Sequence, residues 1–330
     1  MLRVLCVLSI LCAAMAPAFA GPASDVATQG IYEGSFSSGA WKGQPVVVQV
    51  VATGKARFRA VFPFDASTPR VGVNSAADGD KFVFEGEVDL GPAMGGKFEV
   101  SAELVDNRLT GRFKGPGKDS QFRAEKVEKT PPTLGKKPPE GAVVLLDGTN
   151  LDGWERTPPK WRLLGDGAME VCGSNLVTKQ EFGDCEMHIE FRTPFMPDSG
   201  PGTQGRGNSG VYIQGRYEIQ VLDSFGVDPE WNLCGGIYQV AKPIADACLP
   251  PTEWQTYDIS FTAPRFDDTG KKVKNAEITV LHNGIPIHQN LVLPSLTAGG
   301  VSGEEAPTGP IMLQDHGNSV RYRNVWLVPK

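Results

Sequence analysis

The residues best suited to chemistry lie in one short segment near the end of the chain, residues 310–327. Alternation along its first strand places Gln314 and His316 on the same face. After a Gly-Asn turn, alternation places Arg321 and Arg323 together on the next strand. We expect the two strands to pair as a hairpin and to gather an amide, an imidazole and two guanidiniums. These groups suit a polyhydroxylated ligand, because they make directional bonds to oxygen; a solvated sheet face is the alternative.

A second polar face is predicted in residues 216–223, where Glu218 and Gln220 alternate with apolar side chains. Two residues apart on one strand face, these groups are separated by about 7 Å. The apolar set should fill the space between two sheets, so the polar pair should point away from it. Just before this strand, Asn208 and Tyr212 lie in a glycine-flanked entry that allows close approach by a ligand. An ordinary loop-to-strand connection is the alternative.

A third polar row is predicted in the strand over 184–192. His188, Glu190 and Arg192 share one face there, opposite apolar residues. Glu190 is therefore a further candidate for substrate binding. A surface ion-pair row is the alternative for this set.

Other signals narrow the class of protein. The chain has no Gly-x-Ser-x-Gly elbow, no phosphate-binding glycine loop and no His-Glu-x-x-His, which disfavours serine and zinc proteases. Its formal net charge is −6, and it carries no basic run, so we expect no nucleic-acid partner.

The elements that position these residues are predicted to be strands. Glycine and proline, 39 and 26 of 330 residues, are frequent, and long helical periodicity is missing, which indicates an all-β protein. A small antiparallel β domain is predicted over 28–128, with strands at 46–51, 56–62, 81–88, 97–104, 108–113 and 121–127. No catalytic cluster falls in it, so we expect it to be accessory.

A second, larger domain follows a short connection. Residues 129–141 are rich in proline and lysine and read as a stiff, solvated linker. Residues 142–330 contain nine or more strand patterns, which fit a two-sheet jelly-roll sandwich. Long Gly/Pro-rich loops at 194–207 and 294–309 should rim one face.

The first residues predict export. In Met1–Ala20, Arg3 supplies the positive start, residues 4–16 the apolar stretch, and Ala18–Ala20 a small-x-small cleavage site. The apolar run is short for a membrane span, and no later segment approaches one. We therefore expect a secreted or periplasmic protein.

Four cysteines remain after the leader is removed. They are Cys172, Cys185, Cys234 and Cys248. An even number in an exported protein predicts two disulfides, and the preferred pairing joins the first two and the last two. A zinc site is the alternative, but the chain lacks Cys-x-x-Cys spacing.

Several blocks of the second domain together resemble the 3-keto-disaccharide hydrolase family, which includes 3-keto-glucoside 1,2-lyases and 3-keto-2-hydroxy-glucal hydratases. The blocks are Gly-Asn-Ser-Gly-Val-Tyr at 207–212, the run 215–224, Glu-Trp-Gln-Thr-Tyr-Asp at 253–258, Leu-His-Asn-Gly at 281–284 and the run 309–327. The resemblance covers roughly residues 142–330. It implies a concanavalin A-like jelly roll whose concave sheet holds a sugar.

The resemblance also implies a reaction. A ketone at C3 of a sugar acidifies the C2 hydrogen, so a base can remove it while the glycosidic oxygen leaves C1. Water can then add to the 2-hydroxy-glucal. His316 is the base candidate, because an imidazole exchanges protons near neutral pH. Glu218 would protonate the leaving oxygen or ligate a divalent metal, for which His316 is the other possible ligand.

The remaining polar residues take supporting roles in this scheme. Arg321, Arg323 or a divalent cation would stabilise the enolate, while Gln220 and Gln314 would position hydroxyls. Laminarinase-like hydrolases of similar architecture use a Glu-x-Asp-x-Glu strand. The comparable strand here begins at Glu218 and keeps only one of the three acids, so ordinary retaining hydrolysis is disfavoured. The alternative function is a non-catalytic, lectin-like carbohydrate-binding module.

Overall fold

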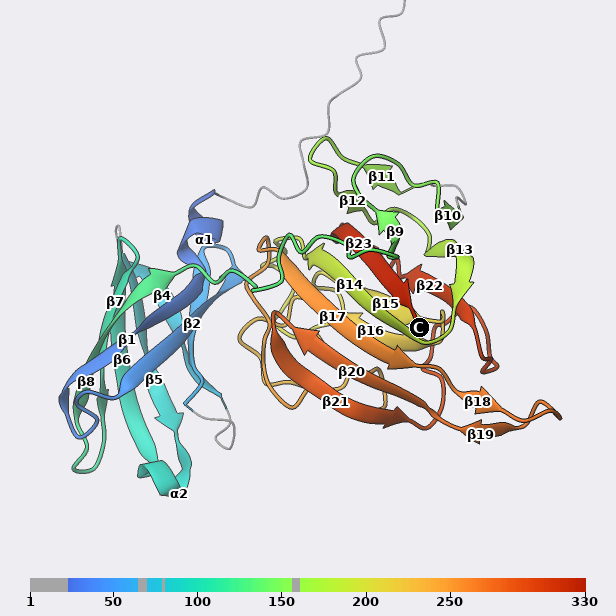
Figure 1. Cartoon of the computed structure of the whole chain (residues 1–330). Coiled ribbons are helices and arrows are strands. Elements are labelled where there is room, and N and C mark those ends of the chain that lie inside the picture. The colour runs from blue at the N-terminus through green and yellow to red at the C-terminus, as the bar shows by residue number, and fades with distance from the viewer. Residues whose placement is uncertain (1–22, 65–69, 79–80, 156–160) are drawn as a thin grey trace, which may run out of the picture.

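The computed structural model describes residues 23–64, 70–78, 81–155 and 161–330, and consists almost entirely of antiparallel strands (Figure 1). It confirms the all-β class, with a jelly-roll sandwich preceded by a smaller β unit. The predicted leader, Met1–Ala20, lies outside the described residues. In the described ranges, no helix has both the length and the apolar character needed to cross a membrane.

The first unit is a closed barrel with two short helices, α1 (Ala23–Thr28) and α2 (Gly91–Met94). Its strands are β1 (Gly30–Gly39), β2 (Pro45–Gly54), β3 (Arg57–Phe62), β4 (Val71–Asp78), β5 (Lys81–Asp89), β6 (Lys97–Val105), β7 (Arg108–Lys114) and β8 (Ser120–Val127). Each strand pairs with the next, and β8 pairs with β1, which leaves no open sheet edge. The six predicted strands are present, and β1 and β4 complete the barrel.

Aromatic side chains fill the barrel. Phe113 lies 5.4 Å from Trp41 and 5.0 Å from Phe62, ring centroid to ring centroid, in edge-to-face contacts. The turn between β6 and β7 is formed by Asp106 and Asn107, both with positive φ, as is typical of a tight hairpin. The interior is therefore a packed core.

The second unit has two main sheets. Its strands are β9 (Val143–Leu146), β10 (Trp154–Glu155), β11 (Arg162–Leu163), β12 (Met169–Glu170), β13 (Leu176–Phe182), β14 (Cys185–Arg192), β15 (Ser209–Ile213), β16 (Tyr217–Val221), β17 (Gln255–Thr262), β18 (Arg265–Phe266), β19 (Lys272–Lys274), β20 (Ala276–His282), β21 (Ile285–Leu293), β22 (Gly309–Leu313) and β23 (Arg321–Pro329). A five-stranded sheet has the order β10-β13-β22-β15-β16, and an eight-stranded sheet has the order β11-β12-β23-β14-β17-β20-β21, with β9 on β23. A small ribbon of β18 and β19 projects from the sandwich (Figure 1).

The core lies between these sheets, and strand alternation decides which residues enter it. Tyr217, Ile219 and Val221 of β16 are fully buried there, as predicted. The Tyr217 ring lies 5.5 Å from that of Phe261 on β17, in the opposite sheet. Glu218 and its neighbours of the same parity therefore face away from the core.

The predicted hairpin over 310–327 is wrong. β22 belongs to the five-stranded sheet, whereas β23 is central in the eight-stranded one. The Gly-Asn segment between them crosses from one sheet to the other. Alternation was correct within each strand, but the pairing partner is chosen by apolar burial across the whole sandwich.

The predicted disulfides are also contradicted, because all four cysteines are free thiols. Cys185 begins β14 and is fully buried in the core, while Cys172 follows β12 in a different part of the sheet. Cys234 and Cys248 are buried in the core, where their side chains contact one another as free thiols, and the Cys234 sulfur lies 3.3 Å from the Tyr257 hydroxyl. Closeness in sequence did not place these thiols in bonding geometry.

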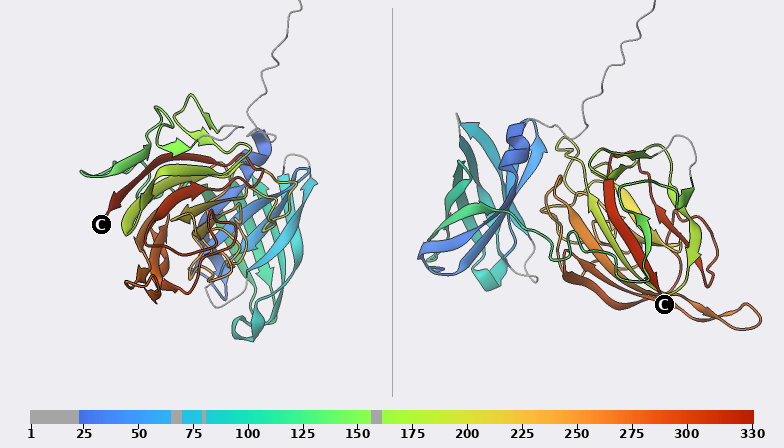
Figure 2. Two further views of the ribbon diagram at one scale, coloured as in Figure 1. Left: turned by 90° about the vertical axis from the view of Figure 1, so that its right-hand side faces the viewer. Right: turned by 45° about the horizontal axis from the view of Figure 1, so that its top comes forward.

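The two units pack against one another through the loops that follow β14 and β16 (Figure 2). Val51 and Val61 of the barrel join the jelly-roll core, while Phe195 of the jelly roll joins the barrel core. Between them, the fully buried Arg206 donates to Ala52 O of β2 at 3.2 Å and to the carboxylate of Asp223 at 2.6 Å. The loop that carries Arg206 is thus fixed from both units.

Candidate active site

A pocket of about 170 Å³ lies on the face of the five-stranded sheet that is turned away from the core. Its lining residues are Gln204, Asn208, Tyr212, Glu218, Gln220, Tyr238, Ala298, Gly299, Gln314 and His316. It brings together, from separate segments, six of the predicted site residues: Asn208, Tyr212, Glu218, Gln220, Gln314 and His316. The imidazole and the carboxylate thus share one hollow.

A larger hollow of about 430 Å³ lies on the outer surface of the barrel. Its charged lining residues include Glu85, Glu103 and Arg112, which are exposed or nearly so. Exposed charges on an open sheet surface stay solvated, which is the ordinary state of such a face. We therefore place the candidate site in the smaller pocket.

Strand register assembles the pocket floor. Tyr212 on β15 lies directly opposite Glu218 on β16, and Gly210 lies opposite Gln220. Just beyond β22, the Gln314 amide N–H donates to Gly210 O at 2.9 Å, which continues the sheet toward His316. Because same-parity residues of neighbouring strands project to one side, three strands supply one polar surface.

The Glu218 carboxyl of the pocket has a raised pKa. Its side chain is only 3 % exposed. Burial raises the pKa of Glu218 to about 7, and a hydrogen bond with Tyr212 opposes the rise only in part. Near neutral pH this carboxyl can therefore both give and take a proton.

Hydrogen bonds hold Tyr212 and Gln220 in place beside Glu218. Gln314 Nε2 donates to the Tyr212 hydroxyl at 3.2 Å, and that hydroxyl donates to Ala298 O at 2.9 Å. A protonated Glu218 can then donate to the same hydroxyl oxygen. The Gln220 amide, in the orientation that satisfies both of its ends, donates to Glu218 Oε1 and to Ser209 O, each at 3.0 Å.

Two amide oxygens of the pocket lack a protein partner. Asn208 Oδ1 and Gln314 Oε1 are buried, and neither accepts a hydrogen bond from any described residue. Asn208 is held in place by its own N–H, which donates to Asn318 Oδ1 at 2.7 Å. Buried acceptors without a partner are costly, so this pocket is prepared for hydroxyl donors of a ligand. His316 lies at the rim, where its side chain is exposed.

Three predicted site residues lie elsewhere. Arg321 and Arg323 are on β23 of the eight-stranded sheet, where they form ion pairs with Glu170 and Glu190 at 2.9 and 2.6 Å. Arg323 also stacks on the Trp254 ring, 4.0 Å from its centroid. Since β23 does not pair with β22, these guanidiniums and Glu190 are not part of the pocket around Glu218.

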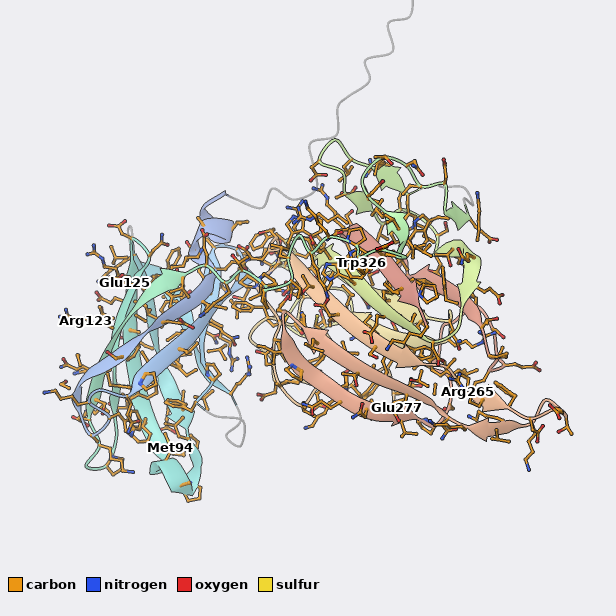
Figure 3. The ribbon with its side chains drawn as sticks, in the orientation of Figure 1. Met94, Arg123, Glu125, Arg265, Glu277 and Trp326 are labelled. Carbon is orange, nitrogen blue, oxygen red and sulfur yellow. The ribbon has the colours of Figure 1, made fainter. Side chains whose placement is uncertain are left out.

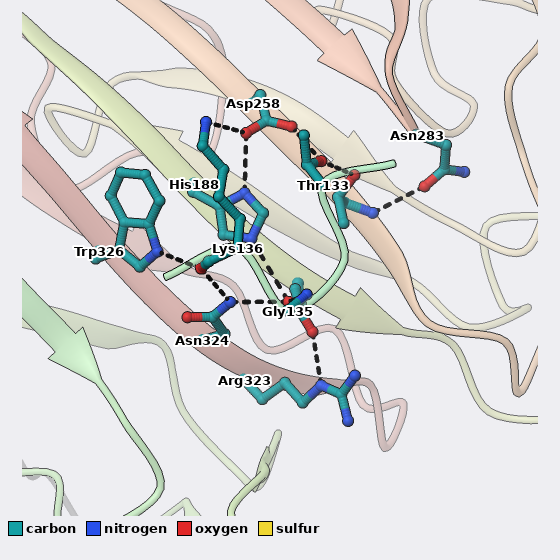
Figure 4. A network of polar contacts seen from close by, with 11 residues as sticks. Thr133, Gly135, Lys136, His188, Asp258, Asn283, Arg323, Asn324 and Trp326 are labelled. Carbon is teal, nitrogen blue, oxygen red and sulfur yellow. Dashed lines mark hydrogen bonds and ion pairs between the residues drawn. The ribbon is translucent and has the colours of Figure 1, made fainter. Parts of the chain in front are cut away.

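Glu190 belongs instead to a polar network that fastens the linker to the jelly roll (Figure 4). Gly135 N–H donates to Glu190 Oε1 at 2.6 Å, and the Thr133 hydroxyl donates to Asp258 at 2.6 Å. His188 lies beneath them, 2.9 Å from Asp258 and stacked on Trp326, which Figure 3 labels near the linker. The linker is therefore docked on the sheet rather than freely solvated as predicted.

These contacts shift the pKa values of His188 and Glu190. Burial lowers the pKa of His188, but the carboxylates of Asp258 and Glu190 raise it by more, so the net shift is upward. Burial raises the pKa of Glu190, but hydrogen bonds from His188, Asn324, Arg323 and Gly135 lower it to about 2. His188 and Glu190 of the predicted row are therefore buried in this network, away from the pocket around Glu218.

Four lining residues were not identified from the sequence: Gln204, Tyr238, Ala298 and Gly299. They come from loops, where no periodicity reports side-chain direction. The only available signal was the prediction that loops 194–207 and 294–309 rim one face, and that placement holds for three of them. Gly299 is required there, because a Cβ would lie 2.8 Å from the Tyr212 hydroxyl.

A metal site would draw on Glu218 and His316. Across the described ranges, no group of three or more His, Cys, Asp or Glu side chains is arranged to hold a metal ion. Two such ligands are fewer than a dedicated cation site provides. We therefore derive no step through a metal.

Known proteins resemble the second unit. A crystal structure described as a "putative glycosyl hydrolase" from Parabacteroides distasonis ATCC 8503 is 35% identical, with a TM-score of 0.53, and the match covers 59% of this chain and 86% of that one. Two further structures from that organism with the same description are 18% and 22% identical, with TM-scores of 0.41 and 0.42; they cover 58% and 57% of this chain and 95% and 99% of their own. A search of curated proteins finds no match. Residues 141–328, more than half of the chain, match the model of the 3-keto-alpha-glucoside-1,2-lyase-like domain, so the chain belongs to that family.

Proposed function

We propose that this protein is an exported carbohydrate-active enzyme that cleaves 3-keto-glycosides by elimination and hydrates the resulting 2-hydroxy-glucal. The observation that carries the proposal is Glu218, a buried carboxyl with a pKa raised to about 7, in one pocket with His316. The family match and the glycosyl hydrolase description of the 35% identical relative support an enzyme that acts on carbohydrates.

The reaction needs two proton transfers. In the proposed mechanism, His316 removes the C2 proton of the 3-keto sugar, and the electron pair forms an enolate with the C3 ketone. The enolate then expels the glycosidic oxygen from C1, and Glu218 supplies the proton that this oxygen takes. Addition of water at C1 and return of a proton to C2 complete a net hydrolysis, so all atoms balance.

Neutral groups of the pocket take the role that the sequence assigned to arginines. The Gln314 amide and the Tyr212 hydroxyl form a fixed hydrogen-bonded pair beside Glu218. Held in this way, the Gln314 amide has a second N–H that can stabilise charge that develops on the C3 oxygen. The partnerless oxygens of Asn208 and Gln314 would accept hydroxyls of the same sugar ring.

Ordinary retaining hydrolysis fits this pocket less well. That mechanism uses two carboxyl groups about 5 Å apart. Glu218 is the only carboxylate among the described residues that line the pocket. An elimination needs one acid and one base of different type, which Glu218 and His316 provide.

Export rests on Met1–Ala20, whose pattern is that of a secretory signal peptide. On this proposal the enzyme meets its substrate outside the cytoplasm. The barrel, which contacts the loop at 194–207, would act as a support for the pocket.

The test is incubation of the purified protein with a 3-keto-disaccharide while the ultraviolet absorbance of the glucal is followed. We expect turnover by the wild type, none of the unoxidised disaccharide, and loss of turnover in Glu218→Gln and His316→Ala. Binding of the 3-keto sugar without turnover would instead support a lectin-like module. Full activity of either variant would remove the assigned acid–base pair.

A further inference from the structure

One exposed aromatic residue stands beside the pocket. Trp231 is 38% exposed, and no other aromatic side chain of the described residues is classed as exposed. Its ring lies 5.2 Å from the ring of Tyr238 in an edge-to-face contact. Tyr238 is itself a lining residue of the pocket that contains Glu218. Trp231 therefore contacts a residue that lines the candidate active site.

The segment that carries both rings is fixed to the strand of Glu218. Gln220 N–H donates to Gly236 O, and Gly235 N–H donates to Gln220 O, each at 2.9 Å. Ile237 of the segment also forms an antiparallel bridge with Ile219 of β16. The aromatic pair is thus held by the backbone of β16 and does not depend on a free loop.

Two further contacts fix the main chain at Trp231. Asn232 O, the next carbonyl along the chain, accepts from Gln204 Nε2 of the pocket wall at 2.7 Å. Gly236 passes so close beneath Trp231 that a Cβ would lie 2.3 Å from the tryptophan carbonyl oxygen. Tryptophan rings are usually largely buried. An exposed ring on a fixed main chain therefore calls for an explanation other than core packing.

The size of the pocket supplies that reason. Its volume of about 170 Å³ is below the ~300–1,000 Å³ of pockets that enclose drug-sized ligands. One sugar ring therefore fills it, and the second ring of a disaccharide must lie outside. The apolar face of a sugar ring packs well on an aromatic ring, whose large rigid surface is cheap to order.

We propose that Trp231 and Tyr238 form the leaving-group subsite of the pocket and bind the second sugar ring of a 3-keto-disaccharide. This inference rests on the proposed function, since it names the part of the substrate that departs. It makes the enzyme selective for substrates whose leaving group is a sugar over those with a small alkyl group. No proton transfer is assigned to either ring.

The test compares two substrates that differ only in the second ring: a 3-keto-disaccharide and the matching methyl 3-keto-glucoside, of the anomer that the wild type cleaves. We expect Trp231→Ala to lower the ratio of kcat/KM for the disaccharide to that for the methyl glucoside about tenfold, mainly through KM. Trp231→Phe, which keeps an aromatic ring, should retain most of the ratio. Ile244→Ala is the matched control, since Ile244 is an exposed apolar residue, 64% exposed, that does not line the pocket.

An unchanged ratio in Trp231→Ala, or an equal loss in Trp231→Phe and Ile244→Ala, would overturn the subsite. If the wild type cleaves neither substrate, the proposed function fails, and calorimetric titration with unoxidised maltose and cellobiose still decides the subsite. Binding that weakens in Trp231→Ala would support it. No binding of either disaccharide, or equal affinity of the wild type and Trp231→Ala, would refute the subsite.

Discussion

A single carboxyl group defines the chemistry at the scale of residues. Glu218 has Tyr212 across the sheet and Gln220 beside it, and neither neighbour carries a charge. A buried carboxyl without a cation keeps its proton to higher pH, which is the property that a general acid needs. A second carboxylate at position 220 would have made the site resemble a retaining hydrolase. The amide there leaves Glu218 to act alone.

Replacing the Glu218 carboxyl by an amide should strongly reduce catalysis without disturbing the fold. We expect Glu218→Gln to lower kcat on a 3-keto-disaccharide by about 10²–10⁴-fold, the usual contribution of a general acid. As a control, Glu277→Gln on β20, in the other sheet, should keep wild-type kcat. The pH profile gives the role: if Glu218 is the acid, kcat falls as pH rises above about 7. Activity that instead rises through pH 7 would make Glu218 the base.

The same carboxyl should make stability depend on pH. The folded state holds its proton with a pKa of about 7, against 4.5 for the ordinary side chain, so stability falls as pH rises between these values. Glu218→Gln is neutral throughout and should escape this loss. We expect the variant to gain up to about 3 kcal/mol over the wild type at pH 8 and little at pH 4. Denaturant unfolding at both pH values measures the gain; an equal effect at the two would contradict the raised pKa.

At the scale of elements, the pocket depends on the close pairing of β15 with β16. Gly210 leaves room for the acid, because a Cβ there would lie 2.3 Å from Glu218 Oε1 and 3.0 Å from the Tyr212 ring. A small displacement of a catalytic group lowers the reaction rate strongly. An added methyl group lowers the stability of the sheet by a smaller amount. Gly210 is therefore needed mainly for the position of Glu218 in the pocket, and less for the stability of β15.

Filling this space should separate activity from stability. We expect Gly210→Ala to lower kcat about 100-fold while it costs about 1–3 kcal/mol of stability. Gly153→Ala is the matched control, since a Cβ at Gly153 meets no atom within 4 Å. Kinetics and thermal unfolding of both variants measure the two effects. Wild-type kcat in Gly210→Ala would show that the carboxylate moves freely in the pocket.

At the scale of the whole molecule, the barrel supports one wall of the site. Arg206 is fully buried between the units and bonds Asp223, Ala52 O of the barrel and Ser199 O at 2.6, 3.2 and 2.8 Å. Its loop also carries Gln204 and Asn208, both of which line the pocket. The Arg206 guanidinium therefore links the first unit to the loop that forms one wall of the pocket.

Breaking this contact should affect both stability and catalysis. Arg206→Ala leaves the Asp223 carboxylate buried without its partner, which should cost about 3–5 kcal/mol. We expect KM to rise, because Gln204 and Asn208 lose their support. The double variant Arg206→Met with Asp223→Leu removes both charges and should recover much of the stability but not the KM. Recovery of both would mean that the barrel contact has no influence on the pocket.

Strand parity is what the sequence by itself determined. The alternation of Glu218 and Gln220 with Tyr217, Ile219 and Val221 fixed the face on which each would lie, because successive side chains of a strand point to opposite sides. The same periodicity indicated the all-β class. These are local properties, set by neighbours in the chain.

Only the tertiary structure decided which faces meet. β22 and β23 are close in sequence, but burial of apolar surface on both sides of the sandwich assigns them to different sheets, so His316 joins Glu218 whereas Arg321 and Arg323 do not. The same long-range packing left the cysteines unpaired and docked the linker over Glu190. It also brought Trp231 and Tyr238 to the rim, since loops have no period and their direction depends on contacts across the fold.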